Sequence, residues 1–312
     1  MNGRMHMSMK DLDRNQVVER LCKKEIKAKH AAKLLGISVR QILRLKKQFR
    51  KDGVKGLISK KVGLPSNNQI SQEKKDLVLN FLSQENHKDF SPVLVHEYLS
   101  KAYSPFISIT SVRQIMIKNG LWTNKKIKPK KAYRLRQRRA QRGELIQLDG
   151  SEHDWFEGRG SRCTLLVYVD DASSEVLHLK FVISENTWDY MDATREYIEM
   201  HGRPCSLYPD KHSVFKINRQ GALTGDGRTQ FSRAMAELEI KVICANSPQA
   251  KGRVERKNRD FQNRLVKAMR LAGINSIEAG NAFIPSFLKE FNQKFAKSPS
   301  NPIDAHKPLL DI

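Results

Sequence analysis

The chain has 312 residues, which is enough for two or three domains, and its formal net charge is +24. No apolar signal segment opens the sequence and no run approaches the ~18 apolar residues of a membrane span, so we expect an intracellular, cytoplasmic protein and no membrane partner. The four cysteines are scattered without a Cys-x-x-Cys pair, which argues against both a zinc site and a disulfide framework.

The positive charge lies in the first part of the chain. Residues 1–143 contain 34 Lys and Arg against 10 Asp and Glu, whereas residues 144–312 contain 23 of each kind. Contacts to phosphates and the release of counterions favour binding of a basic arm to DNA. We therefore expect a double-stranded DNA-binding arm followed by a domain of a different kind.

Residues 1–52 are predicted to form an N-terminal helix-turn-helix domain. Ala32, Gly36 and Ile42 stand at the small-residue, turn and core positions of such a motif, and Ser38 can cap its second helix. A helical hairpin that packs for structure alone is the alternative. Because Arg and Gln side chains can read guanine and adenine in a major groove, the predicted DNA-contacting residues are Arg40, Gln41 and Arg44.

Residues 69–123 are predicted to form a second, helix-turn-helix-like helical domain, after a linker rich in Gly, Lys and Pro over residues 52–68. Thr110 can cap its third helix, on which Arg113 is expected to lie nearest to DNA. The expected helices cover residues 72–83, 92–102 and 111–119.

Residues 124–143 are predicted to be a basic linker. Ten of them are Lys or Arg and none is acidic. Such a segment repels itself unless it lies on a polyanion, so we expect it to follow the phosphate backbone of DNA.

Residues 144–272 are expected to form an α/β core. Hairpin-linked strands followed by strand–helix alternation predict a mixed five-stranded sheet with flanking helices. A polar, Gly-containing segment over residues 218–228 is expected to be a mobile loop, and residues 273–312 a C-terminal helical extension. The expected strands cover residues 144–148, 163–170, 175–182, 205–208 and 240–244, and the expected helices cover residues 188–200 and 230–238, with another starting near Pro248.

Three acids have positions that suggest a common site. Asp149 and Asp210 each follow a short apolar run, so both are expected at strand ends. Glu255 lies near the start of a predicted helix that Ser247 can cap, among six cations where a divalent metal would explain a carboxylate. The alternative is a first-turn acid that the helix dipole favours and that pairs with Arg259. The six cations are Lys251, Arg253, Arg256, Lys257, Arg259 and Arg264.

The chain also resembles a known family, the insertion-sequence transposases of the ISNCY type, within the DDE transposase and retroviral-integrase superfamily. The segments that carry the resemblance are 148–155 (LDGSEHDW), 164–173 (TLLVYVDDAS), 208–215 (YPDKHSVF), 229–231 (TQF), 247–256 (SPQAKGRVER) and 304–309 (DAHKPL). They span nearly all of residues 144–309.

The resemblance implies an RNase H-like catalytic core with Asp149, Asp210 and Glu255 as the catalytic residues and metal ligands. Two Mg²⁺ or Mn²⁺ ions are then expected, because hard cations take oxygen ligands. The implied activity is cleavage at transposon ends and transfer of the freed 3′ strand into target DNA, by a homo-oligomer that is associated with a prokaryotic nucleoid when bound to DNA.

Further residues near these acids are candidates for DNA contacts. Lys251 and Arg253 lie within about one turn of Glu255, and Lys211 and His212 flank Asp210. We interpret Asp170 and Asp171 as structural turn acids and leave His153 and Asp154 open between supporting and surface roles.

The resemblance leaves a second hypothesis open. Related transposases commonly continue past the 304–309 segment into a C-terminal domain, whereas this sequence stops at Ile312. The alternative is therefore a truncated, non-catalytic DNA-binding remnant or repressor of the same element. Hydrolysis of DNA without strand transfer is a third reading of the same site.

Overall fold

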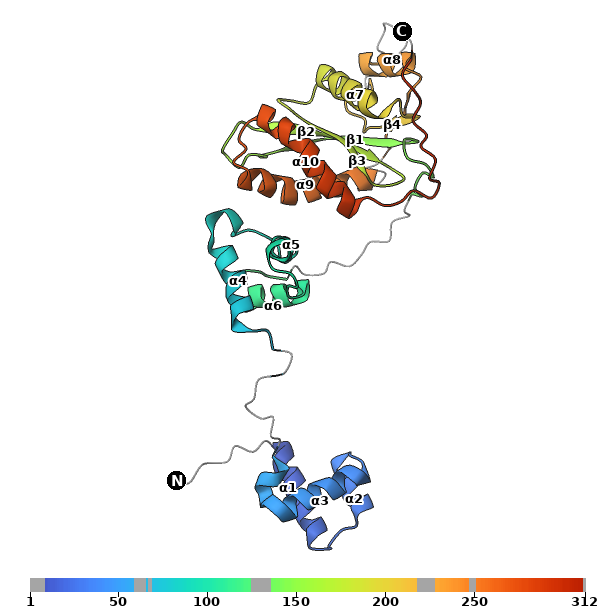
Figure 1. The fold of residues 1–312 in the computed structure, drawn as a ribbon. Coiled ribbons are helices and arrows are strands. Elements are labelled where there is room, and N and C mark those ends of the chain that lie inside the picture. Colours follow the sequence, from blue (N-terminus) through green and yellow to red (C-terminus); the bar gives the residue numbers. More distant parts are fainter. Residues whose placement is uncertain are drawn as a thin grey trace. The chain divides into compact units, whose positions relative to one another are not determined.

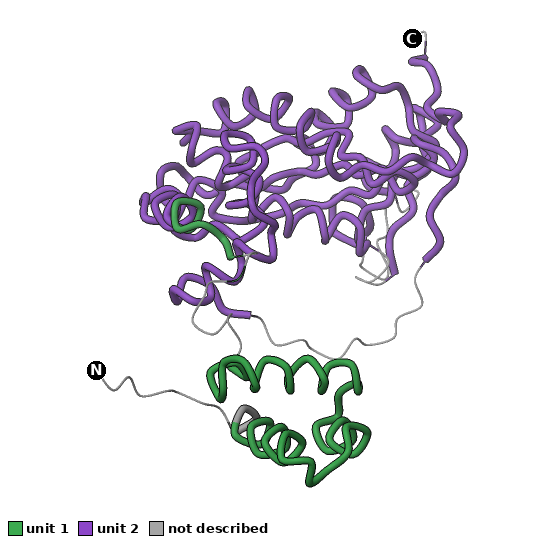
Figure 2. Tube along the Cα trace, turned by 60° about the horizontal axis from the view of Figure 1, so that its bottom comes forward, with its two compact units in different colours: residues 1–75 green, residues 76–312 purple. Residues whose placement is uncertain are grey.

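The computed structural model describes residues 9–58, 66, 69–124, 136–217, 228–246 and 251–310, with side chains from residue 12 onward (Figure 1). The chain divides into two compact units, residues 1–75 and residues 76–312 (Figure 2). Within the described residues, no helix has the length and apolar character needed to cross a membrane.

The first unit contains the predicted helix-turn-helix. Its helices are α1 (Met9–Cys22), α2 (Ala28–Leu35) and α3 (Val39–Asp52). Ile42 is fully buried, Gly36 adopts the left-handed conformation with φ of 63°, and the Ser38 hydroxyl accepts a hydrogen bond from the Gln41 N–H at 3.2 Å. The core, turn and capping roles predicted for these three residues are confirmed.

The predicted linker begins later than the sequence indicated. After α3 the chain continues into the 3₁₀ helix η1 (Gly53–Leu57), whose Leu57 is buried. A Cβ at Gly56 would lie 2.5 Å from the Gln48 carbonyl oxygen, so only glycine permits this close packing on α3. Glycine here permits close packing and does not mark a flexible segment. The glycine-rich composition therefore led us to predict the start of the linker too early.

Three more helices follow, and the first of them spans the boundary at residue 75. They are α4 (Gln72–Ser83), α5 (Pro92–Ala102) and α6 (Ile109–Lys118), with the 3₁₀ helix η2 (Glu85–His87) between α4 and α5. The expected helices are confirmed, but the predicted Thr110 cap is wrong. The cap is Ser108, which accepts a hydrogen bond from the Ser111 N–H at 3.2 Å, because the helix starts one residue before Thr110.

A mixed five-stranded sheet forms the centre of the second unit, in the order β3-β2-β1-β4-β5. The first three strands, β1 (Ile146–His153), β2 (Cys163–Asp170) and β3 (Val176–Val182), are antiparallel. The short strands β4 (Ser206–Tyr208) and β5 (Lys241–Val242) add in parallel beside β1. An antiparallel meander extended by parallel strands is the RNase H-like arrangement, so the predicted fold is confirmed.

Helices cover both faces of this sheet (Figure 1). Leu166 and Tyr168 of β2 pack under α7 (Thr187–His201) and α8 (Gln230–Glu237). Their neighbours Leu165 and Val167 point to the other face, under α9 (Gly252–Leu271) and α10 (Ile277–Phe295). Because successive side chains of a strand alternate between faces, a strand buried on both sides reads as a continuous apolar run.

Two details of the core differ from the sequence-based expectation. Asp149 does not end its strand, since β1 continues in register with β2 as far as the His153–Cys163 pair. The polar residues after Leu148 therefore belong to a paired strand rather than to a turn. Ser247 and Pro248, expected to begin α9, lie outside the described residues, and α9 itself starts at Gly252 with Lys251 as its N-cap. Most of the expected mobile loop, residues 218–227, also lies outside them.

The segment after α10 lies along the core as a C-terminal strap, residues 296–310. Its backbone N–H groups at Asn301 and Ala305 donate to the carbonyl oxygens of Ala140 and Arg142. Lys307 exchanges a pair of 2.8 Å backbone hydrogen bonds with Arg203. The core therefore includes residues before 144 and after 272, beyond the predicted boundaries.

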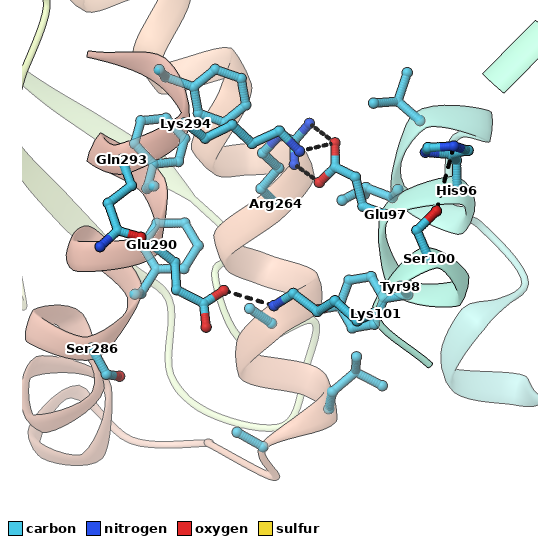
Figure 3. A pocket seen from close by; sticks show the side chains of 18 of the residues that line it. His96, Glu97, Tyr98, Ser100, Lys101, Arg264, Ser286, Glu290, Gln293 and Lys294 are labelled. Carbon is cyan, nitrogen blue, oxygen red and sulfur yellow. Dashed lines mark hydrogen bonds and ion pairs between the residues drawn. The ribbon is translucent and has the colours of Figure 1, made fainter. Parts of the chain in front are cut away.

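The helical segment 76–123 contacts α9 and α10 through ion pairs (Figure 3). Glu97 on α5 accepts two hydrogen bonds from Arg264, at 2.7 and 2.9 Å, and pairs with Lys294 at 2.5 Å. Lys101 pairs with Glu290 at 2.8 Å. A groove of about 1160 Å³, partly lined by phenylalanines of α10, lies between these helices.

Candidate catalytic site

Asp149 lies on β1, and Asp210 lies at the matching position just past the end of the neighbouring parallel strand β4. β1 and β4 pair Ile146 with Leu207, and each aspartate comes three residues after its strand's member of that pair. The backbone register therefore sets the two carboxylates side by side at the point where β4 has ended and β1 continues.

Helix α9 packs against the face of β1 on which the Asp149 side chain lies. The Val254 N–H donates to Gln147 Oε1 at 3.2 Å, and Asn258 Nδ2 donates to Asp149 Oδ2 at 2.6 Å. One helical turn further on, Gln262 Nε2 donates to the Ser151 hydroxyl at 3.4 Å. These α9 residues are four positions apart and their β1 partners are two apart, so each set lies on one face of its element. The three hydrogen bonds therefore fix the position of α9 relative to Asp149.

The ammonium group of Lys251 lies between the two aspartates. Its Nζ is 2.6 Å from Asp149 Oδ1 and 3.8 Å from Asp210 Oδ2. The Lys251 side chain is 5% exposed and that of Asp149 is 20% exposed, so much of this contact is shielded from water. Burial raises the pKa of the Asp149 carboxyl above its ordinary value, while the charge of Lys251 acts in the opposite direction.

Glu255 occupies the helix position between the two residues that contact Asp149. It follows Lys251 by four residues and precedes Asn258 by three, so all three share one side of α9. Its side chain is exposed. Among the described residues, no group of three or more acidic, His or Cys side chains is close enough to hold a metal ion, so the structure does not bring the Glu255 carboxylate together with those of Asp149 and Asp210.

The segment that carries Asp210 is held by its own turn and by the core. Asp210 Oδ1 accepts a hydrogen bond from the His212 N–H at 2.8 Å. Three residues later, Phe215 is buried and packs edge-on against Tyr190 of α7 and Phe231 of α8. The Asp210 carboxylate is thus presented at the surface, 52% exposed, on an anchored backbone.

Asp170 and Asp171 are fully buried and organise turns, which confirms their predicted structural role. Asp170 accepts hydrogen bonds from Ser173 and from the Gly143 N–H. Asp171 accepts hydrogen bonds from Gln147, from Arg253 at 2.7 Å, from Arg136 and from the Arg139 N–H. One buried carboxylate therefore joins β1, α9 and the end of the basic linker.

These ion pairs change the expected role of Arg253 and that of the arginines at the end of the basic linker, all of which were expected to contact DNA. The Arg253 guanidinium is bound to Asp171 and to the Arg136 carbonyl oxygen, rather than turned outward. Arg138 donates to the carbonyl oxygens of Asp171 and Ala172, and Arg142 pairs with Glu175 and Asp304. These arginines anchor the linker to the core, while residues 125–135 lie outside the described part of the chain.

The other predicted DNA-contacting residues lie in three separate places. Arg40, Gln41 and Arg44 are exposed on α3 of the first unit. Arg113 is half-buried on α6, and Lys211 and His212 are exposed beside Asp210. His153 packs edge-on against Trp155, and Asp154 accepts a hydrogen bond from the Gly158 N–H, as turn residues do.

Sequence analysis missed Gln147 and Asn258 as members of the site. Gln147 is fully buried two residues before Asp149, and Asn258 follows Glu255 by three. Both spacings were visible, because strand and helix periodicity put these polar residues on the faces of Asp149 and Glu255. The contact between these two faces could not be predicted, because it depends on how α9 packs on β1.

Comparison with known proteins agrees with this architecture. A transposase-named protein of Sinorhizobium fredii, y4bF, is 42% identical over 307 residues, which cover 98% of this chain and 67% of that protein. The chain belongs to the insertion-sequence transposase family. The transposase for insertion sequence IS1202 of Streptococcus pneumoniae is 28% identical, over 92% of this chain and 69% of the relative. This transposase thus spans about two thirds of the length of each relative.

A family model and two solved structures are also similar to the transposase. A winged helix-turn-helix model matches residues 16–76. The catalytic core domain of HTLV-2 integrase in complex with magnesium is 19% identical, with a TM-score of 0.40, and covers 54% of this chain and 100% of that one. A chain of a simian T-cell lymphotropic virus intasome is 17% identical, with a TM-score of 0.41, covering 65% and 69%.

The donor set of the site fits a hard divalent cation. Asp149 and Asp210 offer carboxylate oxygens, the ligands that Mg²⁺ and Mn²⁺ prefer. The ammonium group of Lys251 between them shows that this position accommodates a positive charge close to both carboxylates. Asn258 holds the second Asp149 oxygen from the side, as a supporting residue of a metal ligand would.

Proposed function

We propose that this transposase cleaves DNA at the ends of its element and joins the freed 3′ strand to target DNA, with Asp149, Asp210 and Glu255 as ligands for two Mg²⁺ or Mn²⁺ ions. The observation that supports this proposal best is the matched placement of Asp149 and Asp210 around one cationic group. Bound ions would polarise the phosphoryl oxygen, activate the attacking hydroxyl and relieve charge on the leaving oxygen.

The protein's own residues would position these carboxylates. Asn258 fixes one oxygen of Asp149, and the His212 N–H fixes one oxygen of Asp210. Each leaves the other oxygen of its carboxylate facing the shared position, where Lys251 now binds. Glu255 is exposed on the same side of α9, and the proposal requires its side chain to turn toward the aspartates when the ions bind.

We propose that recognition of the element ends belongs to the basic first part of the chain. Arg40, Gln41 and Arg44 share the exposed side of α3, where a recognition helix meets base edges. Arg113, Lys211 and His212 are proposed as further contacts to DNA. A homo-oligomer on DNA is part of the proposal, because two ends have to be brought together.

The test is cleavage and strand transfer on labelled DNA that carries the element's own ends, with Mg²⁺ or Mn²⁺ against EDTA. Glu255→Gln, Asp149→Asn and Asp210→Asn are each expected to lower product formation at least about 10³-fold, since charge stabilisation of this kind contributes several kcal/mol. End binding, measured by gel shift, is expected to remain within about threefold.

The matched control is Glu152→Gln, an exposed acid on the same strand as Asp149. Normal strand transfer by Glu255→Gln would remove Glu255 from the ligand set. Tight end binding without any product from the unmodified chain would favour the alternative function, a DNA-binding remnant or repressor.

A further inference from the structure

Lys251 contacts two acidic side chains, which is not expected of a residue that only binds DNA. It is the N-cap of α9, its side chain is 5% exposed, and its ammonium group is directed at Asp149 and Asp210. Both aspartates are proposed metal ligands, so the lysine occupies the place where their free oxygens converge. An ammonium group and a divalent ion seek the same oxygens and cannot both have them at hydrogen-bond distance.

We infer that Lys251 is an internal competitor of the metal, which holds Asp149 and Asp210 together and withdraws when a divalent ion binds. This inference rests on the proposed function. Two neighbouring carboxylates without a nearby cation would repel one another, and Lys251 offsets that repulsion while keeping their spacing. The site is therefore formed before the ion arrives.

The withdrawal of Lys251 needs little rearrangement of the protein. Four methylene groups separate its ammonium group from the backbone, so rotamer changes alone can carry the charge several ångströms away. Asp210 is half exposed, which gives the ammonium group a path toward solvent on that side. A DNA phosphate beside the site would receive the released charge, which reconciles this role with the DNA contact predicted from the sequence.

The two roles imply coupling between metal and DNA. If a phosphate draws Lys251 away from the aspartates, DNA strengthens metal binding, and the metal strengthens DNA binding by the same factor. When a tethered group competes for the site, the apparent affinity for the metal equals the intrinsic affinity multiplied by the fraction of molecules in which the site is free. Removing the competitor should therefore tighten metal binding in the DNA-free protein.

The experiment is calorimetric titration of Mn²⁺ into the full-length, EDTA-treated chain at pH 7. Lys251→Met removes the ammonium group, and Lys251→Gln keeps a neutral donor for Asp149 in case the methionine variant folds poorly. Lys257→Met is the matched control, because Lys257 is also a buried lysine of α9 but lies over the rings of Phe291 and Phe295 instead.

Both Lys251 variants are expected to bind Mn²⁺ about tenfold more tightly than the unmodified chain, which corresponds to a site that is free in roughly one molecule in ten. The control is expected to stay within about twofold, since its charge is not at the carboxylates. Equal or weaker binding by both Lys251 variants would overturn the inference alone. No binding by any of these proteins at millimolar Mn²⁺ would overturn the proposed metal dependence and the inference together.

Discussion

Lys257 shows how an individual charged residue can be buried in this core. Its side chain is 5% exposed and its ammonium group lies 4.7 Å from the centre of the Phe291 ring and 5.6 Å from that of Phe295. Attraction to the ring faces offsets part of the cost of burial. Burial nevertheless lowers the pKa of Lys257 from its ordinary 10.5 to about 8, with the charge of Asp260 acting against the shift.

This lowered pKa predicts a specific pH dependence of stability. Between about pH 8 and pH 10 the unfolded chain holds a proton on Lys257 that the folded chain has lost, so this group's contribution to the free energy of unfolding rises with pH. Urea unfolding of the unmodified chain and of Lys257→Met should show a difference that grows across this interval in favour of the unmodified chain. A constant difference from pH 7 to pH 10 would mean that Lys257 titrates normally.

At the scale of residues, the sequence singled out three candidate acids but not the side chains that contact them. Asp149, Asp210 and Glu255 were predicted from local pattern and family resemblance, and in the structure Asp149 lies on β1, Asp210 follows the end of β4, and Glu255 lies on α9. Asn258 and Lys251 as partners of Asp149 could not be predicted, because they are about 100 residues away in sequence, at separations of 109 and 102. Only the meeting of α9 with β1 selects them among many polar residues.

Helix α10 illustrates how one element protects another. β3 is an edge strand, and two asparagine side chains of α10 form hydrogen bonds with its backbone. Asn281 exchanges hydrogen bonds of 2.7 and 3.0 Å with the Phe181 backbone, and Asn292 exchanges bonds of 3.0 and 2.8 Å with that of Val176. Covering an edge in this way satisfies its free backbone groups and blocks pairing with other chains.

The close approach of α10 to the sheet depends on Gly280. A Cβ at this position would lie 2.9 and 3.1 Å from ring atoms of Phe181, which is buried. We expect Gly280→Ala to lower the free energy of unfolding by about 1–3 kcal/mol, the usual cost of overpacking, despite the better helix propensity of alanine. Urea unfolding followed by circular dichroism measures the change.

The control for this prediction is Gly252→Ala at the start of α9, where an added Cβ meets no atom within 4 Å. It should be neutral or slightly stabilising. A Gly280→Ala protein as stable as this control would show that Phe181 can move aside without cost.

The elements themselves were largely predictable, since long apolar runs and helical periodicity are local signals. β2 matches its predicted range of residues 163–170, and α7 and α8 agree with theirs within one residue at each end. β1 was predicted too short because Asp149, Gly150 and Ser151 have the composition of a turn. Pairing of these residues with β2 overrides that local preference.

At the scale of the whole second unit, charge pairs hold the helical segment 76–123 on the core. Glu97 binds Arg264 and Lys294, and Asp89 binds Arg270 and Lys267. Burial opposes the ionisation of Asp89, but hydrogen bonds from Arg270 and the charge of Lys267 outweigh it and lower the pKa of Asp89 to about 2. The contact is charged at neutral pH, and its exposed pairs weaken with salt.

This arrangement predicts that reversing one charge loosens the contact. Glu97→Lys is expected to raise the rate of amide hydrogen exchange in α5 at least about tenfold, which corresponds to about 1.4 kcal/mol. The double variant Glu97→Lys with Arg264→Glu should recover part of the protection, because it restores an opposite pair. Mass spectrometry of exchanged peptides provides the measurement.

Glu85→Lys is the matched control, because Glu85 is exposed in the same helical segment and forms a local ion pair with Lys88. Unchanged exchange in the Glu97→Lys protein would show that apolar packing alone holds the segment. The sequence predicted the helices of this segment but not its packing against α9 and α10. The segment has few acids and the chain has many cations, so the sequence did not indicate which ion pairs form.

The C-terminal strap also has a consequence for the order in which a new chain matures on the ribosome. The helix-turn-helix unit is complete at residue 75, whereas the Arg203 pairing needs Lys307. At roughly 5–20 residues per second, about 10–50 seconds separate these two points of synthesis. During that interval each nascent transposase carries a finished helix-turn-helix unit and an unfinished core.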